Sequence, residues 1–426
     1  MSSHHQVVLE GKIVDVDRVY EACIGIDDGV ITEIGSNITG ERKLNIKNCL
    51  IFPGFIDPHV HSRVPGDEHK ENFTTLSKAA LNGGVTTVID MPNTKPPTSN
   101  VDVLQSKTKH ALDKSMIDIK FHALIIPENI NQLEILAPYI IGYKIFMGKS
   151  TGGFILPFEF LKETLIQLQK TSKLTTIHCE DQEIIENNTK KFENKNYPEK
   201  HADVRSPDSE IQAVKKLLSL NPDMVNIAHV STAEALKLIE EYRKESKSIF
   251  CEVTPHHLLL VRQDMRRLGN LGKMNPPLRT EGDRLTLING LKSGTINFLA
   301  TDHAPHTKEE KQSPNAPSGV PGLDTYGNVV SLLIEKYDMP PQQLMKVTSF
   351  NAAQAFGLTD RGRIEAGKKA DLTVIDLNKP CKIEANNLYT KCRWSPFEGI
   401  TFPGTVLYTI VNGNVHDPRN LSDAVI

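Results

Sequence analysis

Two kinds of hydrophobic pattern alternate through the middle of the chain, between about residues 51 and 360. Short apolar runs typical of buried strands are followed by amphipathic segments with a helical period. We predict eight strands, at 50–57, 86–91, 120–126, 140–147, 174–179, 225–230, 249–254 and 297–300. Such alternation is the pattern of parallel βα units. Eight units in about 250 residues match a (β/α)8 barrel, whose active site lies at the carboxyl ends of the strands.

Both ends of the chain are β-rich and carry strong turn signals. Asp28-Gly29 and Asn412-Gly413 separate short alternating runs, which is typical of tight hairpins. We therefore predict a small β-sandwich built from both termini. The expected domains are 1–50 and 361–426 for the sandwich and 51–360 for the barrel. Within the barrel, Gly83-Gly84 is expected to end a helix that begins near Asn72.

The composition excludes several classes of protein. Of 426 residues 39% are hydrophobic, which is typical of a globular protein. There is no apolar run long enough for a bilayer and no signal-peptide pattern at the start. A net charge of -3 gives no case for binding nucleic acid or an anionic membrane. Six cysteines without a CxxC pair indicate a reduced, cytoplasmic protein.

Candidate chemistry begins where the first predicted strand ends. His59 and His61 are spaced i and i+2, so in an extended strand both imidazoles point to one face and can reach one metal ion. Arg63 continues this alternation and places a guanidinium beside that metal, suited to holding a carboxylate.

Four more polar residues fall in or at the end of other predicted strands. Lys144 lies in the fourth strand, and His178, His229 and Asp302 end the fifth, sixth and eighth. Taken singly, a strand-end histidine is often structural and Asp302 is a plausible helix cap. Since all six side chains are expected at one mouth of the barrel, we predict a site for zinc or a related divalent ion.

Lys144 is the unusual member of this set, because an ammonium group cannot ligate a metal. Burial beside two dications should lower its pKa, so that the neutral amine could react with carbon dioxide and form a carbamate that bridges two ions. A snorkelling lysine or a substrate contact remains an alternative. Lys149 is a competing candidate five residues further on, but it should face the other way if the strand continues.

Longer motifs surround these residues. Asp57-Pro58-His59-Val60-His61, with the lysine, histidine and aspartate positions above, resembles the amidohydrolase superfamily of binuclear metal hydrolases. Within that superfamily the chain most resembles dihydroorotases of the class I type. The segments that carry this resemblance are 61–66 with 69–71, 91–94, 275–279 and 301–306.

The resemblance implies a role for each position. His59 and His61 would hold one zinc ion, His178 and His229 the second, and carbamylated Lys144 would bridge them. Asp302 would ligate the first ion and shuttle a proton. The substrate carboxylate would be held by Arg63, Asn93 and His306. His61, Asn275 and the backbone near 318–319 would complete the substrate contacts.

The activity that the resemblance implies is the reversible cyclisation of N-carbamoyl-L-aspartate to L-dihydroorotate plus water in pyrimidine biosynthesis, through a metal-bridging hydroxide. One departure concerns the bridging position, where many class I members carry aspartate. Here the segment 142–149 contains lysine instead and is similar to the lysine-bearing branch shared with hydantoinases.

Two alternatives remain open. A hydantoinase, dihydropyrimidinase or allantoinase would also fit the lysine segment, although these enzymes usually lack arginine at the position of Arg63. A non-catalytic scaffold with a hydantoinase-like barrel would typically have lost metal ligands, whereas all six are present here. The expected partners are the small-molecule substrate and either a second copy of the chain or aspartate carbamoyltransferase.

Overall fold

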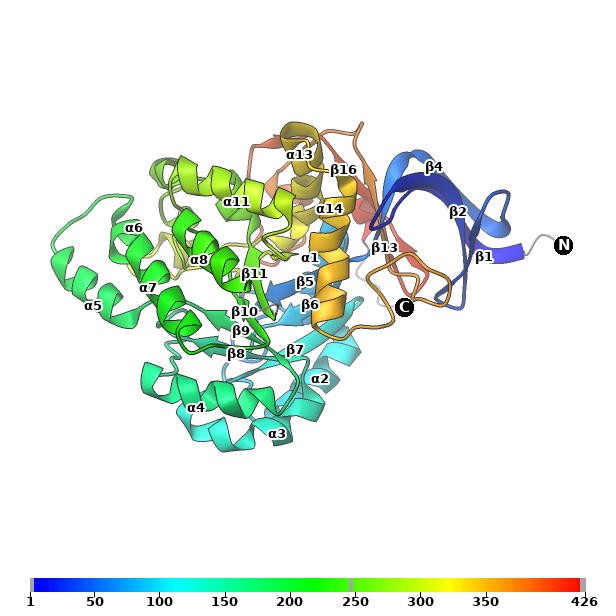
Figure 1. The fold of residues 1–426 in the computed structure, drawn as a ribbon. Helices are drawn as coiled ribbons and strands as arrows, with labels where there is room; N and C mark the ends of the chain where they lie inside the picture. Colours follow the sequence, from blue (N-terminus) through cyan, green and yellow to red (C-terminus); the bar gives the residue numbers. More distant parts are fainter. Residues whose placement is uncertain (1–3, 245–247, 422–426) are drawn as a thin grey trace.

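The computed structural model describes residues 4–244 and 248–421. Figure 1 shows a barrel of strands surrounded by helices, with a separate curled sheet beside it near the N-terminus. The separate sheet contains strands from both ends of the described chain, so these strands lie on the same side of the barrel.

Within the described residues, eight parallel strands follow one another around the barrel in chain order. They are β5 Phe55–Val60, β6 Val85–Asp90, β7 Asp118–Leu124, β8 Gly142–Phe146, β9 Leu174–His178, β10 Val225–Ile227, β11 Ile249–Val253 and β12 Phe298–Leu299. A parallel bridge between Val60 and His303 joins the first strand to the segment after the last one. The predicted (β/α)8 fold is confirmed.

The first predicted strand, 50–57, is wrong in one respect, because it covers parts of two strands in different sheets. The strand β4 (Thr39–Pro53) belongs to the outer sheet, and β5 begins at Phe55 in the barrel. Gly54 separates them, and its amide donates to the carbonyl of Asp371 at 2.7 Å. A Cβ on Gly54 would lie 2.3 Å from Thr86 Oγ1, so the crossing from sheet to barrel requires glycine.

The outer sheet joins both ends of the chain. Its order is β17-β16-β13-β4-β1-β2-β3. The remaining bounds are β1 His4–Val14, β2 Val19–Asp27, β3 Val30–Gly35, β13 Leu372–Asp376, β16 Thr405–Val411 and β17 Asn414–His416; β14 Cys381–Lys382 pairs separately with β15 Thr401–Phe402. The sheet has its own core, which includes Leu9, Ile24, Ile51 and Leu372.

Both predicted hairpins are present in this outer sheet. Asp28 and Gly29 connect β2 to β3, and Asn412 and Gly413 connect β16 to β17, all four with positive φ as tight hairpins require. The separate β unit formed by both chain ends is therefore confirmed. The exact domain boundaries stay a prediction, and β4 itself runs past residue 50.

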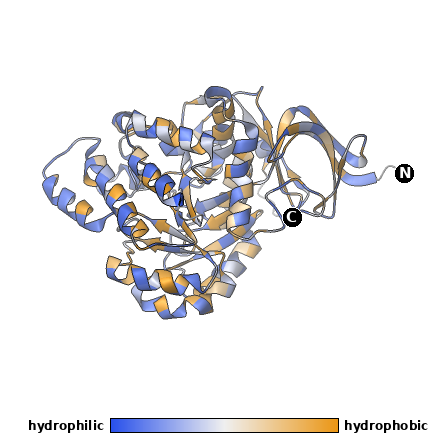
Figure 2. Cartoon of the chain, in the orientation of Figure 1, coloured by the Kyte–Doolittle hydropathy of each residue, from blue (hydrophilic) through white to orange (hydrophobic). Residues whose placement is uncertain are grey.

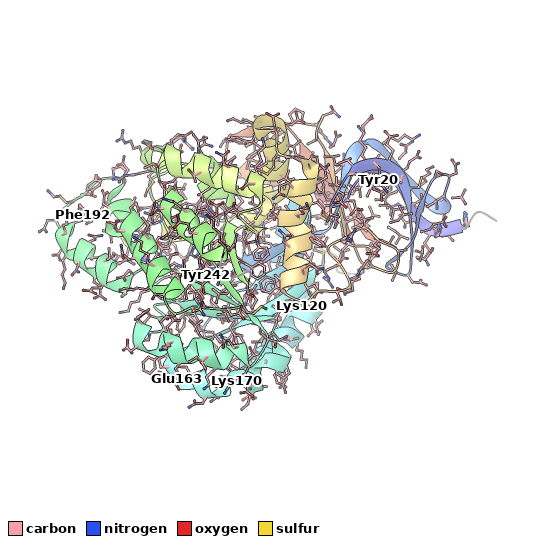
Figure 3. The ribbon with its side chains drawn as sticks, in the orientation of Figure 1. Tyr20, Lys120, Glu163, Lys170, Phe192 and Tyr242 are labelled. Atoms are coloured by element: carbon pink, nitrogen blue, oxygen red, sulfur yellow. The ribbon has the colours of Figure 1, made fainter. Side chains whose placement is uncertain are left out.

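The helices cover the outside of the barrel, and hydrophobic and hydrophilic residues alternate along them (Figure 2). On α4 the buried residues Leu161, Leu165 and Leu168 recur at helical spacing, whereas Glu163, and Lys170 directly after the helix, are exposed (Figure 3). No helix in the described ranges is both long and apolar enough to cross a bilayer. The helices are α1 Phe73–Gly83, α2 Val101–Lys114, α3 Leu133–Leu136, α4 Phe158–Gln169, α5 Gln182–Lys191, α6 Lys200–Val204, α7 Pro207–Leu218, α8 Ala233–Arg243, α9 Pro255–Leu259, α10 Met265–Leu268, α11 Glu281–Ser293, α12 Lys308–Gln312, α13 Tyr326–Tyr337, α14 Pro341–Met345 and α15 Asn351–Ala355.

The first helix of the barrel follows its predicted limits. Asn72 caps α1 by accepting from the amide of Thr75, and Gly84 ends the helix in the left-handed conformation. Gly83 packs against the turn that precedes α13, where a Cβ would lie 1.9 Å from the carbonyl oxygen of Leu323. This helix can therefore reach its neighbour only through a residue without a side chain.

We expect Gly83→Ala to lower the free energy of unfolding by about 2 kcal/mol, because the added methyl group meets backbone rather than a movable side chain. Gly282→Ala is the matched control, since the nearest atom to its Cβ is Thr280 Oγ1 at 3.7 Å. That control should raise stability by about 0.5–1 kcal/mol through helix propensity. Urea unfolding measures the change in the free energy of unfolding for both variants. Equal changes would contradict the close approach of Gly83 to the carbonyl of Leu323.

Candidate active site

The six predicted metal-ligand residues lie at one end of the barrel. His59 is in β5 and His61 follows it, while Lys144 is in β8 and His178 ends β9. His229 lies two residues after β10 and Asp302 three residues after β12. None of the six is more than 8% exposed. The structure therefore brings together side chains that are up to 243 positions apart in sequence, from His59 to Asp302.

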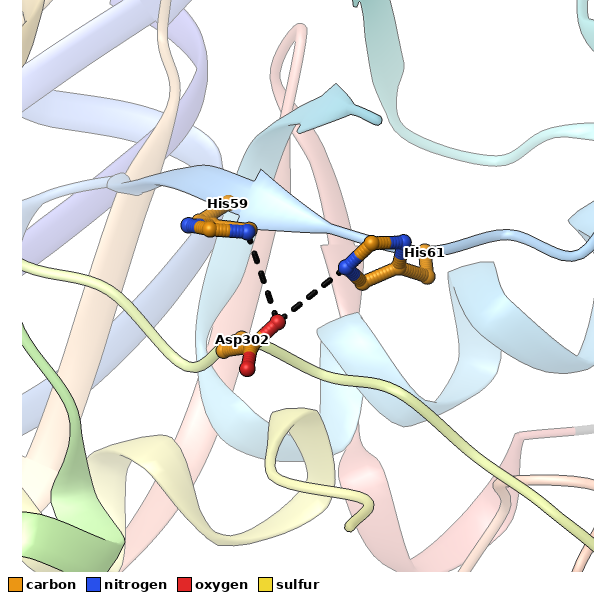
Figure 4. Close-up of side chains that lie close together, drawn as sticks. All are labelled: His59, His61 and Asp302. Atoms are coloured by element: carbon orange, nitrogen blue, oxygen red, sulfur yellow. Dashed lines mark hydrogen bonds and ion pairs between the residues drawn. The ribbon is translucent and has the colours of Figure 1, made fainter. Parts of the chain in front are cut away.

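Three of these side chains form one cluster (Figure 4). Asp302 Oδ1 lies 3.3 Å from His59 Nε2 and 3.1 Å from His61 Nε2. The potential ligand atoms of the three residues all lie within 4.8 Å of one another. Two imidazole nitrogens and a carboxylate oxygen form a donor set that suits zinc.

A second pair of histidines lies next to this cluster. His178 Nδ1 is 3.0 Å from His229 Nε2, so both nitrogens can face one ion. The ring centroids of His59 and His229 are 5.3 Å apart. Lys144 lies at the same place, with Nζ 3.5 Å from His59 Nε2. The residues present fit two neighbouring metal ions, with Lys144 beside them.

Hydrogen bonds on the opposite nitrogen orient three of the four imidazoles. His59 Nδ1 bonds to Glu252, His61 Nδ1 is 2.8 Å from Asn93 Oδ1, and His178 Nε2 is 2.8 Å from Glu180. An oxygen acceptor at one ring nitrogen holds the proton there and leaves the lone pair of the other nitrogen free. In each ring the acceptor lies on the nitrogen opposite the one that faces the cluster, which is the arrangement that a metal ligand needs.

Sequence reasoning did not find Glu252 and Glu180. Glu252 lies in β11, where its carboxylate also accepts from Asn226 Nδ2 at 2.7 Å and from the amide of His229 at 3.2 Å. Glu180 follows β9 and pairs with Arg205, whose Nη2 is 3.0 Å away. A carboxylate inside an otherwise apolar strand was the available signal for Glu252.

The electrostatics of the cluster follow from its burial. Burial, together with the charge of Lys144, lowers the pKa of His59 well below its usual range, so this imidazole is neutral, as a ligand must be. Burial also lowers the pKa of Lys144 to about 8, although Glu252 and Asp302 oppose the shift. Lys149, the competing lysine, is exposed to solvent and does not join the cluster.

A cavity opens above the histidines. Besides these rings, its lining includes Arg63, Asn93, Ser150, Thr151, Asn275, Asp302, Ala304, Ser318 and Gly319. A second cavity lies at the opposite end of the barrel, and its lining includes Asp118, Lys120 and Lys173 but no histidine. Since active sites of such barrels lie at the carboxyl ends of the strands, we assign the candidate site to the first cavity.

Arg63 contributes a positive charge to the cavity wall. Its side chain is buried, with Nε donating to the carbonyl of Pro305 at 3.1 Å. No carboxylate among the described residues forms a salt bridge with its guanidinium. A buried cation that no carboxylate contacts at salt-bridge distance is suited to binding an anionic ligand.

His306 and the two asparagines occupy different positions around Arg63. His306 contacts two residues of the cavity lining from the side away from the cavity. Its Nε2 lies 3.1 Å from Arg63 Nη2 and 3.2 Å from the carbonyl of Ser318. Asn93 bonds to His61 and donates to the carbonyl of Thr151 at 2.9 Å. Asn275 Oδ1 lies 2.9 Å from His201 Nε2. The contacts of these residues with a substrate stay predictions.

The backbone at the site is strained in three places. Arg63, His229 and Asp302 have φ values of +64°, +38° and +46°, which residues other than glycine rarely adopt. Such strain persists only where the surroundings enforce it, and it concentrates at functional sites. No local sequence pattern predicts these conformations.

A buried ion pair holds the turn that contains Arg63. Asp90, at the end of β6, accepts from the amide of Ser62 at 2.7 Å and from its hydroxyl at 2.8 Å. Lys107 on α2 lies 2.5 Å from the same carboxylate, and both charged groups are fully buried. Ser62 stands between His61 and Arg63, so this pair fixes the chain between a candidate ligand and the cavity cation.

We expect Lys107→Met to lower the free energy of unfolding by about 3 kcal/mol, since it leaves the Asp90 carboxylate buried without its counter-charge. The exposed Lys109→Met on the same helix should change stability by less than about 0.5 kcal/mol. The double variant Lys107→Met/Asp90→Asn should recover part of the loss. Urea unfolding of all three variants measures their free energies of unfolding. Equal free energies for Lys107→Met and Lys109→Met would contradict the role of the buried Lys107–Asp90 pair.

Comparison with known proteins agrees with this geometry. The amidohydrolase family model matches residues 50–416. The dihydroorotase of Methanosarcina acetivorans is 39% identical over 413 residues, covering 92% of this chain and 87% of that protein. The dihydroorotase of Pyrococcus furiosus is 37% identical over 415 residues, covering 96% and 92%. The L-hydantoinase (dihydropyrimidinase) of Arthrobacter aurescens has a similar structure, with a TM-score of 0.93, 25% identity and 96% coverage of both chains.

The chain therefore belongs to the amidohydrolase family. Within that family it groups with the dihydroorotases, which makes it an enzyme of the cyclic amidohydrolase class.

Proposed function

We propose that this chain interconverts N-carbamoyl-L-aspartate and L-dihydroorotate in the cytoplasm, as a step of pyrimidine biosynthesis. The observation that carries the proposal is the buried guanidinium of Arg63, which lines the same cavity as the histidine cluster and has no carboxylate partner among the described residues. A cyclic amide that also bears a carboxylate would place the two reacting parts of the molecule against these two features. The names of the similar proteins from M. acetivorans and P. furiosus support the same substrate.

Two zinc ions fit the donor set. We assign His59, His61 and Asp302 to one ion and His178 and His229 to the other, with Lys144 as a carbamate near both. When bound, two such ions acidify a water molecule and polarise the amide carbonyl of the substrate. The neutral state of the imidazoles and the lowered pKa of Lys144 support this assignment.

The protein residues would orient the substrate and move the proton. Arg63 binds the substrate carboxylate and so fixes the ring amide above the histidines. In the hydrolytic direction water adds to the amide carbon and the ring C–N bond breaks. Asp302 accepts the proton of the water and delivers it to the departing nitrogen. In the biosynthetic direction the same steps run in reverse, and Asp302 returns the proton as water leaves.

The second candidate is a cyclic amidase of the hydantoinase, dihydropyrimidinase or allantoinase type. The structural similarity to the A. aurescens enzyme favours it, as does the lysine in β8. The substrates of these enzymes lack the carboxylate that Arg63 would bind. Association with a second copy or with aspartate carbamoyltransferase belongs to the same proposal.

The direct test is ultraviolet absorbance of zinc-supplemented protein with L-dihydroorotate, with hydantoin and allantoin assayed in parallel. Ring opening of dihydroorotate alone is the expected result. Turnover of hydantoin or allantoin without dihydroorotate would favour the second candidate. No turnover of the three compounds by protein that binds zinc would contradict both.

We expect Asp302→Asn to retain zinc but to lose about a thousandfold in turnover, because an amide oxygen can still ligate while it cannot accept a proton. Zinc content by mass spectrometry and the absorbance assay measure the two effects separately. Activity close to that of the unaltered enzyme would exclude Asp302 as the proton carrier.

Arg63→Ala should raise the KM for dihydroorotate about a hundredfold, since the substrate carboxylate would be buried without a counter-charge. Arg266→Ala, whose side chain is 73% exposed, is the control and should leave KM unchanged. An Arg63→Ala enzyme with an unaltered KM and kcat/KM would show that the substrate carboxylate binds elsewhere.

A further inference from the structure

Lys311 is a fully buried lysine outside the histidine cluster. It lies on α12, in the segment between β12 and α13. Its Nζ donates to three backbone carbonyls, those of Lys273 at 2.9 Å, Pro317 at 3.0 Å and Gly319 at 3.0 Å. An ammonium group has three donors, so this tripod uses all of them.

The three carbonyls belong to two segments that line the cavity. Pro317 and Gly319 flank Ser318, and Lys273 lies two residues before Asn275. The same segments are joined directly, because the amide of Gly319 donates to the carbonyl of Lys273 at 2.9 Å. Lys311 therefore closes a junction between two parts of the chain that both reach the cavity wall.

A third segment of the chain, which contains Trp394, contacts the same lysine. The ammonium lies 5.8 Å from the centre of the Trp394 ring, and Trp394 Nε1 donates to the carbonyl of His306 at 2.8 Å. The neighbouring Glu310 faces the other way and lies 3.1 Å from His69 and 3.4 Å from Lys70. The short helix α12 is thus attached on both sides to segments around the mouth of the barrel.

The junction leaves little room for adjustment. Gly319 has a φ of +140°, and a Cβ there would lie 2.5 Å from the carbonyl oxygen of Ala304. The carbonyl of Ser318 accepts from Thr151 Oγ1 at 3.0 Å and lies 3.2 Å from His306 Nε2. The backbone from 317 to 319 is therefore held at successive residues, and Lys311 supplies two of the contacts.

A buried ammonium group destabilises the folded protein unless its charge has a specific role. An apolar side chain of similar length would fill the same space without the cost of desolvating a charge. Burial, together with Lys273 and Arg63, lowers the pKa of Lys311 to about 7, and the three carbonyl acceptors oppose this shift because they favour the ammonium form. No carboxylate among the described residues forms a salt bridge with it. What this lysine provides, and an apolar side chain would not, is a fixed arrangement of the three carbonyls that accept from it.

We propose that Lys311 is a positioning residue that sets the shape of the cavity wall formed by Asn275, Ser318 and Gly319. It does so by holding the 317–319 backbone against the segment that carries Asn275. The consequence for substrate binding rests on the proposed function, whereas the consequence for the backbone does not.

The test combines hydrogen exchange with kinetics on the zinc-loaded enzyme. Lys311→Met keeps most of the length of the side chain and removes its donors. We expect exchange at the amide of Gly319 to be about tenfold faster and KM for the cyclic substrate to rise about tenfold. Zinc content should not change and kcat should change by less than about threefold, since the histidine cluster is not contacted by Lys311.

Lys308→Met is the matched control, because it removes the same charge from the same helix without touching the three carbonyls; it should alter neither exchange nor KM. Lys311→Gln is a second variant in case the methionine variant does not fold; its shorter side chain keeps two donors instead of three, so smaller changes in the same direction are expected. Unchanged exchange at Gly319 in a folded variant would overturn the proposal. Faster exchange with an unchanged KM would overturn the positioning role.

These outcomes are separable from the proposed function. If the unaltered enzyme opens hydantoin rather than dihydroorotate, the substrate assignment fails, and KM for hydantoin becomes the kinetic measure for Lys311. If no cyclic amide is turned over, exchange at Gly319 alone decides whether Lys311 holds the junction.

Discussion

The arrangement of the candidate site depends on hydrogen bonds made by the far nitrogens of its histidines. Glu252, Asn93 and Glu180 each accept from one ring and so turn the opposite nitrogen toward the space shared with Asp302 and Lys144. Burial supports this arrangement, because it keeps imidazoles neutral and disfavours the ammonium form of Lys144. A metal centre of this kind is defined as much by the acceptors behind the ligands as by the ligands themselves.

The cavity wall around Arg63 and Ser318 is held by a different set of buried charges. The Lys107–Asp90 pair fixes Ser62 and thereby the strained turn at Arg63. Lys311 joins the carbonyls on either side of Ser318 to the segment before Asn275. Both devices place a lysine ammonium in the interior, where its hydrogen bonds are strong and its misplacement is costly. Both lysines therefore hold the backbone of the cavity wall through hydrogen bonds or a salt bridge.

Much of the fold could be predicted from the sequence because the signals are local. Apolar runs and helical periods lie within single elements, and the spacing of His59 and His61 already places both on one face of a strand. The switch between sheets at Gly54 was missed because apolar residues flank Pro53-Gly54 on both sides, and the turn signal of this pair was read as part of one strand. Glu252 was missed because it is 193 positions from His59 in sequence and meets it only across the closed barrel. The positive φ of Arg63 and Asp302 likewise arises from tertiary contacts rather than from residue type.

The most direct test of this account is the number of zinc ions that the purified chain retains. Inductively coupled plasma mass spectrometry on zinc-supplemented, desalted protein measures this number without relying on any substrate. Because four neutral imidazoles, Asp302 and Lys144 converge at one end of the barrel, the account predicts two ions per chain. Fewer than one ion per chain would contradict it and would instead indicate a barrel that keeps these side chains without a metal centre.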